Sequence, residues 1–129
     1  MPGIPLMKLS GVVLGSLNAA ELAAFYQRLL GWEVEQDEPG WMKLKSPDGG
    51  AGLSFQTEEA HLSPVWPADP GDQQMMVHLD FEVDDLDVAG AHAIAAGAVL
   101  ATYQPEDDVR VYIDPAGHPF CLFLAEGPV

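Results

Sequence analysis

The sequence GVVLGSLN at residues 11–18 has a faint counterpart, HLDFEVDD, at residues 78–85. Each copy is a strand-like apolar stretch that leads into an Asn or Asp, residue types that cap a helix. The helix after the first copy should end at LLGW, residues 29–32, and the second at AAGA, residues 95–98, because glycine terminates helices. This repeat predicts two copies of a strand, a helix and three strands, with a ligand cleft where the halves face each other.

Composition and charge exclude several classes of function. The chain has 129 residues, a length typical of one domain with a single core. Its formal net charge of −15 disfavours binding to nucleic acid or to an anionic membrane, and no apolar run approaches the roughly 20 residues of a membrane span. No secretory signal is recognisable, and the single cysteine, Cys121, excludes an internal disulfide. We therefore expect a cytoplasmic protein that binds neither nucleic acid nor membranes.

Hydrophobic periodicity and turn residues divide the chain, as a single domain over residues 1–129, into two halves and a crossover. For the first half, about residues 6–58, we expect a helix that Asn18 caps and Gly31 ends, with strands near 8–16, 32–38, 41–45 and 51–57. For the second, about residues 75–126, we expect a helix capped by Asp84 or Asp85, with strands near 75–83, 99–104, 109–113 and 119–124. The proline-rich crossover, residues 59–74, carries Trp66, which either covers a cleft or belongs to a plain linker packed on the core.

Three segments, in this order, resemble the vicinal oxygen chelate superfamily of glyoxalases, bleomycin resistance proteins and extradiol dioxygenases. They are residues 18–31 with the pairs Phe25-Tyr26 and Leu30-Gly31, residues 78–85, and DPAGHPF at residues 114–120. The last two are similar to the branch called glyoxalase-like domains. The resemblance implies an α+β fold in which two βαβββ modules form a cup-shaped mixed sheet with the helices outside. It also implies a homodimer, since members of this fold commonly pair.

The resemblance further implies where a metal would lie, because the enzymes of the superfamily hold a divalent ion with side chains from the first and last strand of each half. The matching positions are Gly11, Leu53, His78 and Cys121, with Gln56 replacing Leu53 if that strand slips in register. Only His78 is a conventional ligand, and Cys121 could serve only as a thiolate. Because zinc-like sites need about three protein ligands, we expect no metal at the family position and no cofactor. A non-standard site that involves His78 and Cys121 stays open.

Strand alternation selects candidates for the cleft wall, on the faces opposite the apolar rows that pack under the helices. The ligand-binding candidates are Trp41, Phe55, Trp66, His78, Arg110, Tyr112, Cys121 and Phe123. Three of them have structural alternatives. His78 could be a surface partner of Asp80, Arg110 could form a hairpin ion pair with the aspartates beside it, and Cys121 could be a small buried hydrophobe.

Three functions remain. The first is a binding protein that holds a small aromatic or amphipathic molecule without the usual metal site, as the bleomycin resistance members do; the acidic surface would favour a cationic ligand. The second is a lyase or dioxygenase of the same superfamily with a degenerate metal site, or with His78 as a general base. The third is a regulatory subunit with a vestigial pocket. We expect the partners to be a small-molecule ligand and a second copy of the chain.

Overall fold

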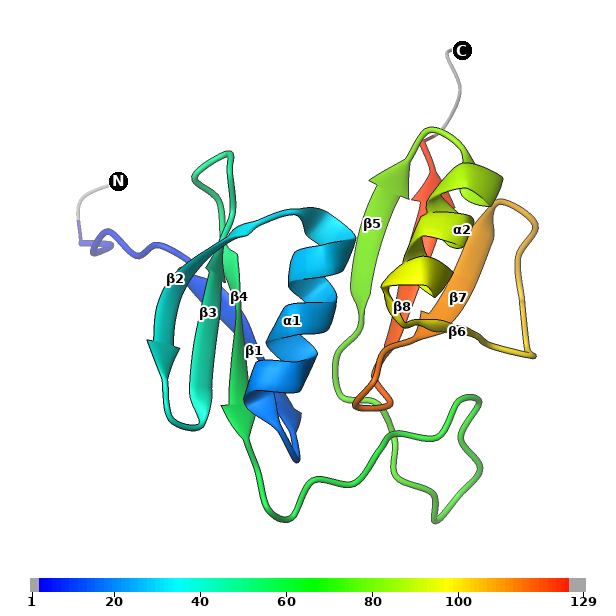
Figure 1. The fold of residues 1–129 in the computed structure, drawn as a ribbon, viewed down its shortest axis with the longest axis horizontal. Helices are drawn as coiled ribbons and strands as arrows, with labels where there is room; N and C mark the ends of the chain where they lie inside the picture. Colours follow the sequence, from blue (N-terminus) through cyan, green and yellow to red (C-terminus); the bar gives the residue numbers. More distant parts are fainter. Residues whose placement is uncertain (1–2, 126–129) are drawn as a thin grey trace.

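The computed structural model describes residues 3–125 and shows two modules of like construction (Figure 1). The first module contains β1 (Gly11–Ser16), α1 (Ala19–Leu30), β2 (Glu33–Glu38), β3 (Trp41–Lys45) and β4 (Gly52–Thr57). The second contains β5 (Leu79–Val83), α2 (Leu86–Ala96), β6 (Val99–Leu100), β7 (Val109–Ile113) and β8 (Pro119–Leu124). The predicted boundary at residue 126 lies outside the described residues.

The two modules have the same strand order. The first sheet runs β1-β4-β3-β2 and the second runs β5-β8-β7-β6, so each is a mixed sheet of four strands. In both, the first strand pairs in parallel with the last, with Gly11 opposite Gly52 and Asp80 opposite Cys121. The predicted α+β class with two βαβββ modules is confirmed. The strands are divided between two sheets, one per module, within the described residues.

The predicted helix ends are confirmed at both modules. The Asn18 side-chain oxygen accepts a hydrogen bond from the Glu21 amide at 3.1 Å, and Gly31 ends α1 with a φ of 70°, a left-handed conformation that suits glycine. Of the two candidate caps for α2, Asp85 is the one used, since its carboxylate accepts from the amides of Asp87 and Val88. These caps satisfy backbone amides that have no partner within the first turn of each helix.

The core lies between the helices and one face of each sheet. Helix α1 contacts both modules, and Figure 1 shows it between the first sheet and β5. Its Tyr26 ring stacks on Phe55 of β4 with centroids 5.5 Å apart, and its hydroxyl donates to Asp114 of the second module at 2.7 Å. The helices also touch, since Arg28 Nε donates to the Ala96 carbonyl at 2.9 Å. Each sheet therefore has one helix-covered face and one face turned away from the helices.

The segment between β4 and β5, residues 58–78, which includes the crossover, contains neither helix nor strand. Its first part is tied to the second module: the His61 Nε2 and the Ser63 hydroxyl lie 2.8 and 3.1 Å from the Ala116 carbonyl oxygen. Such contacts fix the path of the chain towards Trp66 and His78. Among residues 3–125, no helix has the length and apolar character needed to cross a membrane.

Candidate functional site

The face of the second sheet that points away from the helices carries the polar and acidic side chains. Along β5, Leu79, Phe81 and Val83 pack against the core, so Asp80 and Glu82 are exposed on the opposite face. The register of β8 and β7 adds Cys121 beside Asp80 and Val111 beside Cys121. His78, two residues before Asp80, shares this face, which is called the open face below.

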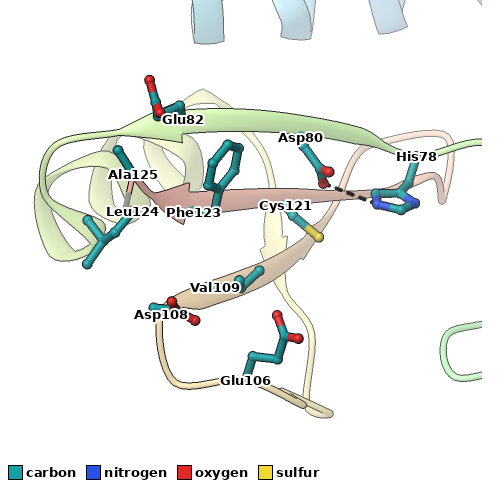
Figure 2. A pocket seen from close by; sticks show the side chains of 10 residues that line it. All are labelled: His78, Asp80, Glu82, Glu106, Asp108, Val109, Cys121, Phe123, Leu124 and Ala125. Atoms are coloured by element: carbon teal, nitrogen blue, oxygen red, sulfur yellow. Dashed lines mark ion pairs between the residues drawn. The ribbon is translucent and has the colours of Figure 1, made fainter. Parts of the chain in front are cut away.

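An open hollow of about 630 Å³ lies over the open face (Figure 2). Its wall includes four carboxylates, and no lysine or arginine among the residues described contributes to it. The lining residues are His78, Asp80, Glu82, Glu106, Asp108, Val109, Cys121, Phe123, Leu124 and Ala125. The apolar side chains come from β7, from β8 and from Ala125 after it, and two of the carboxylates come from the loop that precedes β7. We call this the acidic hollow.

A second hollow of about 180 Å³ adjoins the acidic hollow and shares His78, Glu106, Val109 and Cys121 with it. The remaining wall is apolar, formed by Trp66, Met75, Pro105, Val111 and Pro119. The Trp66 indole Nε1 donates to the Tyr103 carbonyl at 3.4 Å, and its ring centroid lies 5.9 Å from that of Tyr103. The crossover thus places an aromatic side chain beside the strands of the second module. We call this the apolar hollow.

Three donor groups of different chemistry meet where the hollows join. The His78 Nε2 lies 3.1 Å from an Asp80 oxygen, and the ligand atoms of His78, Asp80 and Cys121 all lie within 4.8 Å of one another. Figure 2 shows the imidazole and the carboxylate directed towards each other, with the Cys121 sulfur beside them. Burial, and then the negative charge and hydrogen bonding of Asp80, raise the pKa of Cys121 to about 11. The thiol is therefore protonated at neutral pH and is a poor nucleophile in this state.

The structure brings together four of the eight candidate ligand-binding residues: Trp66, His78, Cys121 and Phe123 line the two hollows. The placement predicted for Phe55 and Tyr112 is wrong. Phe55 is fully buried under α1, and Tyr112 stacks on Phe120 with centroids 5.8 Å apart, where its hydroxyl packs closely against Gly90 of α2. Both residues lie on helix-covered faces, so they belong to the core.

Arg110 and Trp41 also lie away from the two hollows. The Arg110 Nη1 donates to the carbonyl oxygens of Asp107 and Val109 at 2.7 and 2.9 Å, so the side chain stabilises the turn before β7. Of the two aspartates beside it, Asp107 takes part in these bonds, through its backbone carbonyl. Trp41 lies on β3 of the first module, where its Nε1 donates to Gln36 at 2.6 Å. Within residues 3–125, the two hollows over the second module are therefore lined without the aromatic residues expected from the first.

The four positions that the resemblance assigned to a metal do not converge. Gly11 has no side chain, and Leu53 is buried on the helix-covered face of the first sheet. Gln56, the alternative to Leu53, is exposed on the first module and donates to Glu58 at 2.7 Å. His78 and Cys121 do lie close together, and Asp80 supplies a third donor beside them. A nitrogen, an oxygen and a sulfur within this distance fit a zinc-like ion in number and kind.

Glu106, Asp108, Val109 and Val111 are site residues that sequence reasoning missed. The signal that could have found them is the short turn DPAGH at residues 114–118. This turn pairs Ile113 with Pro119, and Tyr112 with Phe120. Because Phe120 belongs to the apolar row of β8, the pairing puts Tyr112 in the core and leaves Val109 and Val111 beside Cys121 and Phe123.

Comparisons with known proteins agree with this architecture. A family model described as "Glyoxalase-like domain" matches residues 11–123. A glyoxalase/bleomycin resistance protein/dioxygenase family enzyme from Burkholderia phytofirmans PsJN superposes with a TM-score of 0.68 at 23% identity, over 92% of this chain and 98% of that one. A glyoxalase/dioxygenase from Nostoc punctiforme gives 0.65 at 21% identity, over 98% and 96%. A lactoylglutathione lyase from Agrobacterium tumefaciens gives 0.62 at 18%, over 95% and 96%. A comparison with curated protein sequences found no significant match.

Proposed function

The chain belongs to the glyoxalase-like domain family of the vicinal oxygen chelate superfamily, and on that premise we propose that it binds a small, positively charged amphipathic molecule. The molecule lies over the open face of the second module, without the family's usual metal site. The observation that carries this proposal is the junction of two unlike hollows, one walled by four carboxylates and one by apolar side chains that include Trp66. A ligand with a cationic end and an aromatic or aliphatic end matches both walls.

Three kinds of force are available to hold a cationic amphipathic ligand in the two hollows. Burial of roughly 100 Å² of apolar ligand surface beside Trp66 and Met75 contributes about 2–3 kcal/mol. Contact of a cation with an indole face adds about 0.5–2 kcal/mol. The carboxylates of Asp80, Glu82 and Asp108 attract the same cation and repel anions. The apolar and cation–aromatic contacts together give about 2.5–5 kcal/mol, and attraction by the carboxylates has to supply the rest of the roughly 8 kcal/mol that corresponds to micromolar binding.

The competing proposal is an enzyme of the same superfamily, a lyase or a dioxygenase, and one observation favours it. The His78 Nε2 lies 3.1 Å from the Asp80 carboxylate, an arrangement that orients an imidazole as a general base next to a ligand in the hollow. The lactoylglutathione lyase from Agrobacterium tumefaciens is 18% identical to this chain, so the similarity supports a shared fold and does not by itself support a shared reaction. Under this proposal, His78→Gln abolishes turnover of the bound molecule and leaves its affinity nearly unchanged.

Tetraphenylphosphonium, an aromatic cation, tests the binding proposal, and tetraphenylborate, an anion of the same shape, is its control. We expect the phosphonium to bind zinc-free protein saturably in calorimetry with a Kd in the micromolar range, and the borate to bind at least about tenfold more weakly, because only the cation is attracted by the acidic wall. Trp66→Ala should weaken phosphonium binding by about 5- to 30-fold through the lost aromatic contact.

Trp41→Ala is the matched control for that variant, since Trp41 is on the first module. Its affinity for tetraphenylphosphonium should equal that of the unchanged protein. Equal binding of the cation and the anion would contradict the proposal. So would a loss of affinity in Trp41→Ala as large as that in Trp66→Ala, because the site would then span both modules.

We also propose that the chain forms a homodimer. The extended segment before β1 exposes four large apolar side chains, those of Ile4, Leu6, Met7 and Leu9, with exposed fractions of 67, 100, 83 and 72%. A run of this kind is costly in water and is typical of contact surfaces. Light scattering at micromolar concentration should give about twice the 13.8 kDa chain mass, and a mass near 13.8 kDa would refute the dimer.

A further inference from the structure

Independently of the ligand proposed above, we infer that His78, Asp80 and Cys121 form a binding site for a divalent ion of the zinc class. All three belong to the second module. Asp80 and Cys121 are register partners on the parallel strands β5 and β8, and His78 precedes Asp80 by two residues, so the three side chains leave the sheet on the same face. The backbone pairing therefore holds the ligand positions together before any ion binds.

The distances suit an ion with short bonds. Zinc–ligand bonds of about 2.0–2.3 Å place tetrahedral donors roughly 3.3–3.8 Å apart. The ligand atoms of the three residues all lie within 4.8 Å of one another, and His78 Nε2 and Asp80 Oδ1 are 3.1 Å apart. Small side-chain rotations, with no movement of the strands, are enough for the donors to converge. The acidic hollow lies directly above, which leaves a fourth coordination position open to water or ligand.

The donor chemistry selects the class of ion. An imidazole nitrogen, a carboxylate oxygen and a thiolate sulfur are ligands of zinc and cobalt, whereas magnesium and calcium prefer oxygen alone. The thiol releases its proton to solvent when sulfur binds, so the ligand set carries a charge of −2 that the ion neutralises. Glu106 adds negative charge near Cys121, and Glu82 and Asp108 line the same hollow, which raises the local concentration of cations.

This set differs from the one that the resemblance implied. Asp80 matches no position carried over from the superfamily, and the first module contributes no ligand, since Gly11 lacks a side chain and Leu53 faces the core. Three ligands from one module replace a set drawn from both. Without an ion, His78 pairs with Asp80 and the Cys121 thiol hydrogen-bonds to the same carboxylate, so the test below is directed at the sulfur, which only an ion would convert to a thiolate ligand.

The experiment uses untagged full-length protein, first stripped with a chelator and then titrated with cobalt(II) and with zinc. We expect one equivalent of cobalt to bind with a near-ultraviolet thiolate-to-cobalt charge-transfer band and the visible absorption of a tetrahedral ion, and zinc to displace it. Cys121→Ser should abolish the charge-transfer band. Asp80→Asn should lower zinc affinity by at least about tenfold, because even outer-shell partners are worth about 10- to 100-fold in metal affinity.

Asp37→Asn, on the exposed strand β2 of the first module, is the control and should bind zinc as the unchanged protein does. Circular dichroism of each variant checks that it folds. The inference is overturned if cobalt gives no charge-transfer band, or if Cys121→Ser keeps the full zinc affinity. The two tests are independent. Absence of metal binding would not change the tetraphenylphosphonium affinity measured on zinc-free protein, and absence of phosphonium binding would not change the metal titration.

Discussion

Replacing Phe120 by alanine is expected to lower the free energy of unfolding by about 3–5 kcal/mol, the range seen when a fully buried aromatic side chain is removed. Phe120 lies on β8 and has no exposed surface. Its ring is within 6.2 Å, centroid to centroid, of aromatic rings from α1, β5 and β7, which belong to Phe25, Tyr26, Phe81 and Tyr112. The substitution therefore opens a cavity at the point where α1 packs on the second module. Urea unfolding followed by circular dichroism measures the loss.

Phe123→Ala is the matched control, because Phe123 lies on the same strand but points into the acidic hollow and is only partly buried. We expect it to cost about 1 kcal/mol, in keeping with its smaller buried area. If both variants lost the same stability, the assignment of the two faces of the second sheet would be wrong. The candidate site, which depends on that assignment, would fail with it.

The double variant Glu82→Lys/Asp108→Lys is expected to lower the affinity for tetraphenylphosphonium by on the order of 100-fold. Each unit of charge within about 8 Å contributes roughly 0.5–1 kcal/mol at the dielectric of a partly exposed site in dilute salt, and the variant changes the local charge by four units. Both carboxylates line the acidic hollow, and neither is among the donors of the metal site. Calorimetry at low ionic strength measures the change, which should shrink as salt is added.

A control with the same change in net charge separates the effect of the carboxylates in the acidic hollow from the effect of the protein's overall charge. Glu33→Lys/Glu38→Lys alters two exposed residues of β2 in the first module, so it changes the charge of the protein equally but leaves the acidic hollow intact. Its affinity for the cation should fall by no more than about threefold, because the attraction that it loses is long-range and largely screened by salt. An equal loss in both double variants would mean that the cation binds to the acidic surface in general.

Much of the fold could be predicted because its signals are local. The caps at Asn18 and Asp85, the terminating Gly31 and the turns between strands are encoded within a few residues of where they act. The alternation of Leu79, Asp80, Phe81 and Glu82 likewise showed which side of β5 is exposed, and so placed His78 and Asp80 on one face. The repeat supplied the two-module architecture.

The site was harder to predict, because it depends on which face of each strand turns towards a helix. Phe55 and Tyr112 were assigned to the cleft by alternation alone, but alternation identifies two rows without saying which row the helix covers. The answer lies in long-range contacts: Tyr26 stacks on Phe55, and Gly90 leaves room for the Tyr112 hydroxyl. The sequence also leaves open whether Trp66 covers a cleft or packs on the core. Its position depends on the irregular crossover and on its contact with Tyr103.

Amide chemical-shift mapping by nuclear magnetic resonance, on zinc-free protein titrated with tetraphenylphosphonium, tests the binding site most directly. We expect saturable shifts concentrated in the amides of residues 78–82, 106–111 and 121–124 and at Trp66, the parts of the chain that supply most of the lining of the two hollows. The chemical shifts of the amides of β2 and β3 in the first module should stay unchanged. Shifts centred on Trp41 and Lys43, or the absence of any saturable shift at β5 and β8, would contradict it.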